Sequence, residues 1–76
     1  MCLGVPGKVV EIIDEYNAKT EITGVFRNVN TSYLADDQLK DLIGKWVLIH
    51  VGFAMSVINE ADALASLKLL SELGSD

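Results

Sequence analysis

Cysteine is almost absent from this sequence, which contains a single one, Cys2, in 76 residues. One cysteine excludes an intrachain disulfide, and a lone thiol is typical of a protein kept in a reducing compartment. No apolar stretch approaches the ~20 residues that cross a bilayer. The first residues also lack the basic segment and the long apolar segment of a signal peptide. We therefore expect a cytoplasmic protein that does not insert into a membrane.

Basic residues are also few, since 6 of them stand against 11 acidic ones and give a net charge of -5. They form no run and no helical stripe, and are scattered over Lys8, Lys19, Arg27, Lys40, Lys45 and Lys68. A protein that neutralises nucleic-acid phosphates needs a basic patch. Neither nucleic acid nor an anionic membrane is therefore expected as a partner.

The chain is too short for a large core, because a domain of this size buries only about 60% of its unfolded surface. Half of its residues are nevertheless apolar and only one is proline, so the chain is expected to fold. We predict a single domain over residues 1–76. Within it, residues 1–7 form a mobile motif around Cys2, residues 8–58 a β-barrel and residues 59–73 a helix.

Two segments carry strand patterns, residues 8–30 and residues 45–58. In the first, a β-branched run is followed by Asn17, a residue suited to a hairpin turn. The alternation changes phase after Gly24, which indicates either a bulge in a barrel strand or a turn between two short strands. In the second segment, Gly52 breaks the pattern. Before Gly52 the strand has two mostly apolar faces, and we expect both to be covered. One face consists of Val47, Ile49 and Val51, and the other of Trp46, Leu48 and His50.

Between these segments, residues 31–44 show no clear period, and they predict either a single helical turn or an irregular loop. After the second segment a helix is predicted, because Asn59 is a good N-cap, Asp62 stands in a capping-box position and Gly74 provides a stop. Its apolar residues form two stripes, Ala61, Leu64, Leu67 and Leu70, and Ala65, Leu69 and Leu73. We expect most of this surface to pack on the barrel and part to remain for a partner. The predicted fold is mainly β, a small OB-like β-barrel with a C-terminal α-helix.

Cys2 and His50 are the two residues to which chemistry is best assigned. Removal of Met1 would leave a free α-amine beside the Cys2 thiol, and both groups bind metals once deprotonated. The residues alone leave open whether Cys2 has such a role or is an incidental residue of a frayed tail. His50 lies on a mostly apolar face, where a lone histidine is either a hydrogen-bonded structural residue or a ligand.

One cysteine and one histidine are too few for a closed structural zinc site, which takes four protein ligands. A metal held by Cys2 therefore needs further ligands from another protein. Catalysis by a terminal thiol would need oxyanion donors and a substrate pocket, for which so small a barrel offers little. We expect a binding protein rather than an enzyme, and the alternative function is that of an OB-like nucleic-acid-binding module.

Two segments of the sequence resemble the hallmark segments of the HypC/HupF/HybG hydrogenase maturation factors. They are "MCLGVPGKVVEI" at the N-terminus, with Cys2, and "GKWVLIHVGFAMSVINEADA" further on, with His50. The middle stretch "ITGVFRNVN" is also similar to the family. Lys45 and Trp46 stand where the family usually has an acidic residue and a tyrosine, and residues 31–43 match less closely.

This resemblance implies a chaperone of [NiFe]-hydrogenase maturation. Members of the family bind HypD and share with it an iron atom that carries cyanide and carbon monoxide, the Fe(CN)2CO group. They deliver this group to the precursor of the hydrogenase large subunit. Cys2 would be the transient iron ligand or docking group, His50 is a second candidate ligand, and no permanently bound cofactor is implied. The residues that would contact a partner are Cys2, Leu3, Gly4, Val5 and Pro6.

Overall fold

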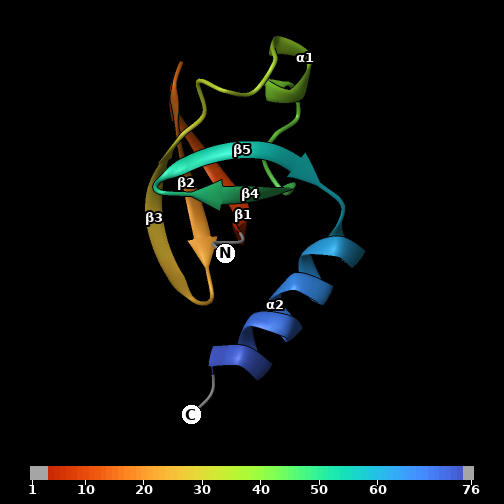
Figure 1. The fold of residues 1–76 in the computed structure, drawn as a ribbon. Helices are drawn as coiled ribbons and strands as arrows, with labels where there is room; N and C mark the ends of the chain where they lie inside the picture. Colours follow the sequence, from red (N-terminus) through yellow and green to blue (C-terminus); the bar gives the residue numbers. More distant parts are fainter. Residues whose placement is uncertain (1–3, 75–76) are drawn as a thin grey trace.

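The protein is a five-stranded β-barrel that carries one long helix at its C-terminal end (Figure 1). The computed structural model describes residues 4–74. Its elements are, in chain order, β1 (Val5–Asp14), β2 (Asn17–Ile22), β3 (Val25–Asn30), α1 (Asp36–Leu39), β4 (Trp46–His50), β5 (Phe53–Ile58) and α2 (Glu60–Gly74). The predicted mainly β architecture with a C-terminal helix is confirmed. None of the helices in this part of the chain has the length and apolar character needed to cross a membrane.

The strands close into a barrel in the order β1-β2-β3-β5-β4, with β4 returning to β1. Neighbouring strands run antiparallel except β3 and β5, which are parallel and whose register contains the pair Asn30 and Phe53. The closing pairs run from Val5 beside Ile49 to Lys8 beside Trp46. A closed five-stranded barrel with this crossover is OB-like, as the sequence predicts.

The barrel begins earlier in the chain than the sequence analysis expects. Residues 1–7 are predicted as a mobile motif, but residues 5–7 belong to β1 and pair with β4. The prediction is wrong for these three residues because pairing with β4 fixes their backbone. Gly7 fits this position because it lacks a Cβ, which would lie 2.6 Å from Thr20 Cγ2 and 2.8 Å from Ile49 Cδ1.

Two-residue turns connect β2 to β3 and β4 to β5. Thr23 and Gly24 have φ angles of 48° and 88°, and Val51 and Gly52 have φ angles of 54° and 82°. Turns with positive φ at both central residues match the twist of the flanking strands. Gly24 is therefore a turn residue, so that of the two alternatives for this position the turn is correct. Val51 is 80% exposed in its turn, and the expectation that it shares a covered strand face is wrong.

The turn between β1 and β2 is held by the Asp14 carboxylate. Asp14 Oδ1 accepts hydrogen bonds from the Tyr16 backbone N–H and from Asn17 Nδ2, each 2.9 Å long. The bond from Tyr16, followed by the bond from Asn17, holds the pKa of the Asp14 carboxyl below its ordinary value. This contribution to stability is present above the unfolded-state pKa near 3.8 and is lost as the pH falls through the lowered folded-state pKa. Asn17, expected in the turn, begins β2 instead.

The segment between β3 and β4 closes one end of the barrel. It contains α1, so that of the two alternatives for this segment the single helical turn is correct. Leu34 and Leu42, which lie on either side of α1, are buried in the core. Figure 1 shows α1 at one end of the barrel, and the start of β1 together with α2 toward the other.

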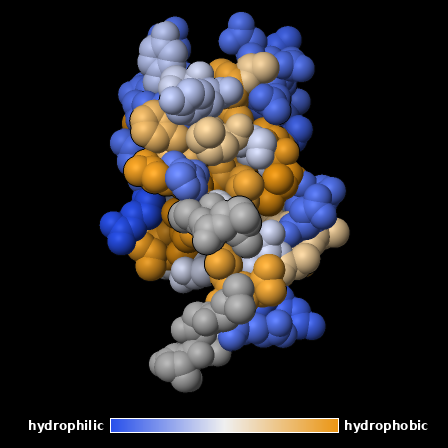
Figure 2. Space-filling view, in the orientation of Figure 1, coloured by the Kyte–Doolittle hydropathy of each residue, from blue (hydrophilic) through white to orange (hydrophobic). Residues whose placement is uncertain are grey.

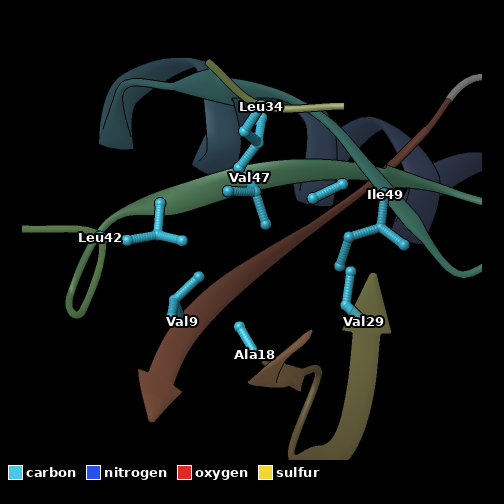
Figure 3. Close-up of a cluster of buried hydrophobic side chains, with 8 residues drawn as sticks. Val9, Ala18, Val29, Leu34, Leu42, Val47 and Ile49 are labelled. Atoms are coloured by element: carbon cyan, nitrogen blue, oxygen red, sulfur yellow. The ribbon is translucent and has the colours of Figure 1, made fainter. Parts of the chain in front are cut away.

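The core consists of small aliphatic side chains from all five strands and from both flanks of α1. Its members are Val9, Ala18, Val29, Leu34, Leu42, Val47, Ile49 and Ala54. Figure 3 shows the labelled side chains of this set converging on the barrel interior. Thr20, two residues after Ala18 on β2, is also fully buried, and its Oγ1 has no hydrogen-bond partner in the described part of the chain. A buried hydroxyl without a partner lowers stability.

Helix α2 begins at a side-chain cap and packs on the barrel by one stripe. The Asp62 backbone N–H donates to Asn59 Oδ1 at 2.7 Å, which confirms the predicted N-cap. The helix contacts β1 and β4, and its covered stripe consists of Ala63, Ser66, Leu67 and Leu70. Leu64 and Leu69 are 52% and 44% exposed, so the expectation that most of both apolar stripes is covered is wrong. Figure 1 shows the reason, since the later turns of α2 extend past the barrel.

We predict that Thr20→Val stabilises the protein by about 1 kcal/mol. Valine keeps the shape of threonine and replaces the unpaired hydroxyl with a methyl group, so the cost of burying that hydroxyl disappears. Urea unfolding followed by the fluorescence of Trp46 measures the change. Thr20→Ala is the control, because it also removes the Cγ2 methyl and should destabilise by about 1 kcal/mol. A loss of stability in Thr20→Val would show that the hydroxyl is hydrogen-bonded.

Candidate functional site

The structure describes part of the predicted N-terminal motif. Cys2 and Leu3 lie outside the described residues, and the first described residue is Gly4. Gly4 and Val5 are half-buried, whereas Pro6 is buried. Pro6 therefore anchors the motif in the barrel wall, and Gly4 is the described residue nearest to Cys2 along the chain.

Gly4 lies tightly against β4. A Cβ at Gly4 would lie 2.6 Å from Leu48 Cγ and 3.1 Å from the Ile49 carbonyl oxygen. The register of β1 with β4 pairs Val5 with Ile49, so its antiparallel continuation by one residue brings Gly4 opposite His50. The close approach requires glycine, and it joins the predicted motif to the end of β4 that carries the candidate histidine.

A small apolar pocket opens between the start of β1 and α2. Its volume is about 130 Å³, and its lining consists of Gly4, Leu48, Ser66, Leu69 and Leu70. A cavity of this size holds a group about as large as benzene or one aliphatic side chain. Figure 2 shows hydrophobic residues across the middle of the face seen in Figure 1 and hydrophilic ones along its upper edge. Gly4 of the predicted motif therefore lies beside an apolar surface.

His50 lies half-buried at the end of β4, beside Phe53 in the register with β5. The Phe53 ring packs edge-on against Tyr33, with 5.3 Å between the ring centroids. No hydrogen bond or ion pair joins the His50 side chain to any residue of 4–74. A structural histidine in a barrel wall is normally hydrogen-bonded to the chain. The contacts within residues 4–74 thus favour a His50 ring whose nitrogens are free to bind water or another molecule.

Metal-ligating residues do not gather in the described part of the chain. Within residues 4–74, no three His, Cys, Asp or Glu side chains lie close enough together to hold a metal ion. His50 therefore belongs to no such group of ligands there. A metal bound at this end of the barrel would therefore need donors from outside residues 4–74.

A second, larger pocket lies where α2 leaves the barrel. Its volume is about 480 Å³, and its lining consists of Lys8, Gly44, Lys45, Trp46, Val57, Ile58, Asn59 and Glu60. The sequence analysis does not group these residues, because Lys8 and Trp46 meet only through the register of β1 with β4. No short-range pattern in the sequence signals this pocket. Lysine, glutamate and apolar side chains share its lining, which is unlike the basic groove of a single-strand-binding protein.

The fold and the site together define a small OB-like barrel protein in which Gly4, the first described residue of the predicted N-terminal motif, lies beside an apolar pocket, and in which a half-buried histidine ends β4. The model of the HupF/HypC family matches residues 1–70, and the chain belongs to this family. The matched residues include the N-terminal motif, all five strands and most of α2. The resemblance that the sequence segments indicate is thereby confirmed.

Curated relatives match along nearly the whole chain. The sequence is 50% identical to the hydrogenase maturation factor HypC of Rhodobacter capsulatus, over 97% of this chain and 79% of the relative. It is 42% identical to the hydrogenase maturation factor HybG of Escherichia coli strain K12, over 100% of this chain and 95% of HybG. It is also 44% identical to the hydrogenase maturation factor HypC of that strain, over 96% of this chain and 82% of HypC.

We predict that Gly4→Ala lowers the free energy of unfolding by about 1–2 kcal/mol. The added methyl group would overlap Leu48 Cγ, so that β1 or the Leu48 side chain has to shift. Urea unfolding measures the loss. Leu48→Ala should also destabilise the protein, but the double variant should lose less than the sum of the two, because the overlap is then relieved. Strictly additive losses would contradict the close contact.

Proposed function

We propose that this protein is a chaperone of [NiFe]-hydrogenase maturation that carries an iron group between two protein partners. In this proposal it binds HypD, helps to assemble the Fe(CN)2CO group there, and delivers the group to the precursor of the hydrogenase large subunit. The observation that carries the proposal is the match along nearly the whole chain to relatives named hydrogenase maturation factors. Because the iron group is cargo, the protein needs no permanently bound cofactor.

Cys2 is the residue proposed to hold this cargo. A thiolate is a soft ligand, which suits iron that carries cyanide and carbon monoxide. Neighbouring Cα atoms are 3.8 Å apart, so the Cys2 Cα lies at most about 7.6 Å from the Gly4 Cα. Continuation of the β1–β4 register by one residue would bring Gly4 opposite His50. The proposed ligand is therefore separated by only two peptide bonds from the residue that continues the register toward the end of β4.

His50 is proposed as a second iron ligand or as a contact to a partner. It is half-buried, and its ring has no hydrogen bond to residues 4–74 that binding would have to break. One thiolate and one imidazole do not complete the coordination of an iron atom that carries three diatomic ligands. The remaining donor would come from HypD or from the large-subunit precursor, and exchange of that donor would pass the group from one protein to the next.

The residues after Cys2 are proposed to support its contact with a partner. Leu3 belongs to this set through its position in the motif. Gly4 and Val5 are half-buried and can be reached by a partner, whereas buried Pro6 would act by holding the strand in place. The apolar pocket beside Gly4 adds room for one aliphatic side chain of that partner.

We further propose that the protein acts in the cytoplasm, by binding and transfer rather than by catalysis. The alternative, a nucleic-acid-binding module, is favoured by the OB-like barrel alone. The net charge of -5 and the separation of the basic residues argue against it. A salt-dependent mobility shift with single-stranded oligonucleotide would be the evidence in its favour.

Cys2→Ser should abolish hydrogenase maturation and leave the fold intact. Serine keeps the size and hydrogen bonding of cysteine but not the soft thiolate, and the free energy of unfolding should stay within about 0.5 kcal/mol of the wild-type value. Hydrogenase activity in cells that lack their own HypC-type factor measures maturation. The infrared bands of cyanide and carbon monoxide on co-purified HypD report the cargo. Maturation at the normal rate would end the ligand role and leave Cys2 at most a docking contact.

His50→Ala should lower maturation while the free energy of unfolding stays within about 0.5 kcal/mol of the wild-type value. The reason is that His50 has no hydrogen bond within residues 4–74 that the substitution would remove. Urea unfolding and the same cellular assay give the two readouts. A parallel loss of stability and maturation would contradict this expectation and make His50 a structural residue.

A further inference from the structure

Strand β3 leaves most of one edge unpaired. It pairs with β2 over its full length, from Asn17 beside Asn30 to Ile22 beside Val25. On its other side, the register with β5 contains one pair, Asn30 and Phe53. The stretch of β3 that precedes Asn30 therefore has a free edge within the part of the chain that the structure describes.

The hydrogen bonds show which backbone groups face this free edge. The Asn30 N–H donates to the Gly52 carbonyl oxygen at 2.9 Å, on the side away from β2. Alternate residues of a strand direct their N–H and C=O groups to the same side, so Phe26 and Asn28 also direct theirs away from β2. No hydrogen bond from residues 4–74 satisfies these groups. Phe26 and Asn28 thus offer a row of donors and acceptors to one more strand.

The side chains along this edge are accessible, and among the features that usually protect an edge strand it has only one charged residue, Arg27. Phe26 is 56% exposed and Val25 is 48% exposed. Strand β3 contains neither proline nor lysine, the residues that commonly block pairing at an edge. Lys19 Nζ on β2 lies 5.1 Å from the centre of the Phe26 ring and helps to hold it on the outer face. Arg27, on the opposite face, is the charged residue of β3.

We propose that the free edge of β3 is a docking site for an extended segment of another protein, which adds one strand to the barrel. In this mode of recognition, main-chain hydrogen bonds to Phe26 and Asn28 give the affinity, and alternate side chains give the specificity. The segment that fits best has an acidic residue opposite Arg27 and an apolar residue opposite Phe26. The proposal rests on β3 and does not depend on the role proposed for Cys2.

A second copy of this chain fits the same edge less well. Two copies could pair antiparallel about a two-fold axis through the outward N–H and C=O groups of both Phe26 and Asn28. Phe26 of each copy would then pair with Asn28 of the other, and the two Arg27 residues would lie opposite one another. This central pair would be non-hydrogen-bonded, with Cα atoms about 4.5 Å apart. Like charges directly opposite one another are destabilising. The charge of Arg27 therefore selects a segment of another protein with an acidic residue at this position.

A peptide titration followed by amide hydrogen exchange of the full-length protein tests the proposal. The probe is a short capped peptide of alternating valine and threonine around a central glutamate. In the free protein the Phe26 and Asn28 amides should exchange fast, whereas the Arg27 and Val29 amides, which face β2, are protected. Saturating peptide should slow exchange at Phe26 and Asn28 at least about tenfold and leave Arg27 and Val29 unchanged. Unchanged exchange at Phe26 and Asn28 would overturn the proposal.

Two matched peptides separate backbone pairing from charge. The same peptide with N-methyl groups on alternate residues has lost its donors and should give no protection. The peptide with lysine in place of glutamate should bind up to about fivefold more weakly. Arg27→Glu should reverse that preference, and an unaltered preference would remove Arg27 from the docking site.

A proline substitution on β3 tests the edge itself. Asn28→Pro removes one donor from the free edge without removing a hydrogen bond to β2, and should weaken peptide binding at least about fivefold. Asn28→Ala keeps the donor and should bind like the wild type, while protected amides at Ala18 and Val47 show that each variant is folded. Unchanged affinity in folded Asn28→Pro, or binding of the N-methylated peptide, would overturn the proposal. Protection of Phe26 without peptide that grows with protein concentration would overturn it as well, in favour of a second copy.

Discussion

Pairing between β1 and β4 closes the barrel. Of all the pairs of neighbouring strands, this pair is the furthest apart in sequence. This pairing restricts which residue types fit in β1. Gly7 must lack a side chain, because Thr20 and Ile49 occupy the space that a Cβ would need. Pro6 is tolerated because β2 pairs with β1 only from Lys8 onward, so its missing N–H removes no hydrogen bond to β2.

The same pairing creates the two pockets described above. At one end of the register, Gly4 reaches Leu48 and continues toward His50, beside the smaller pocket. At the other end, Lys8 meets Trp46 in the larger pocket. Helix α2 borders both pockets because it packs on β1 and β4. Each pocket therefore forms only when the barrel closes, because its lining residues come from distant parts of the sequence.

A barrel of this size leaves its functional groups on the outside. The interior is lined by small aliphatic residues and by Leu34 and Leu42 from the flanks of α1. The surfaces that the described residues leave open to a partner include the end where β1 begins, the outer stripe of α2 with Leu64 and Leu69, and the edge of β3. These surfaces suit a protein that binds other proteins more than one that encloses a substrate.

The sequence by itself determined the features that depend on near neighbours. The strand alternation predicted the β-barrel, Asn59 predicted the start of α2, and the two segments with Cys2 and His50 identified the family. Such signals need only local periodicity, capping chemistry or a motif. They do not specify which distant strands pair with one another.

Tertiary structure decided what those local signals left open or predicted wrongly. It placed residues 5–7 in β1, because their pattern becomes a strand only when β4 supplies the partner. It made Gly24 a turn and moved Val51 out of its strand, because both belong to hairpins whose register is set across the barrel. It also chose which stripe of α2 is covered, since the angle at which the helix leaves the barrel is fixed by packing on β1 and β4 rather than by helical period.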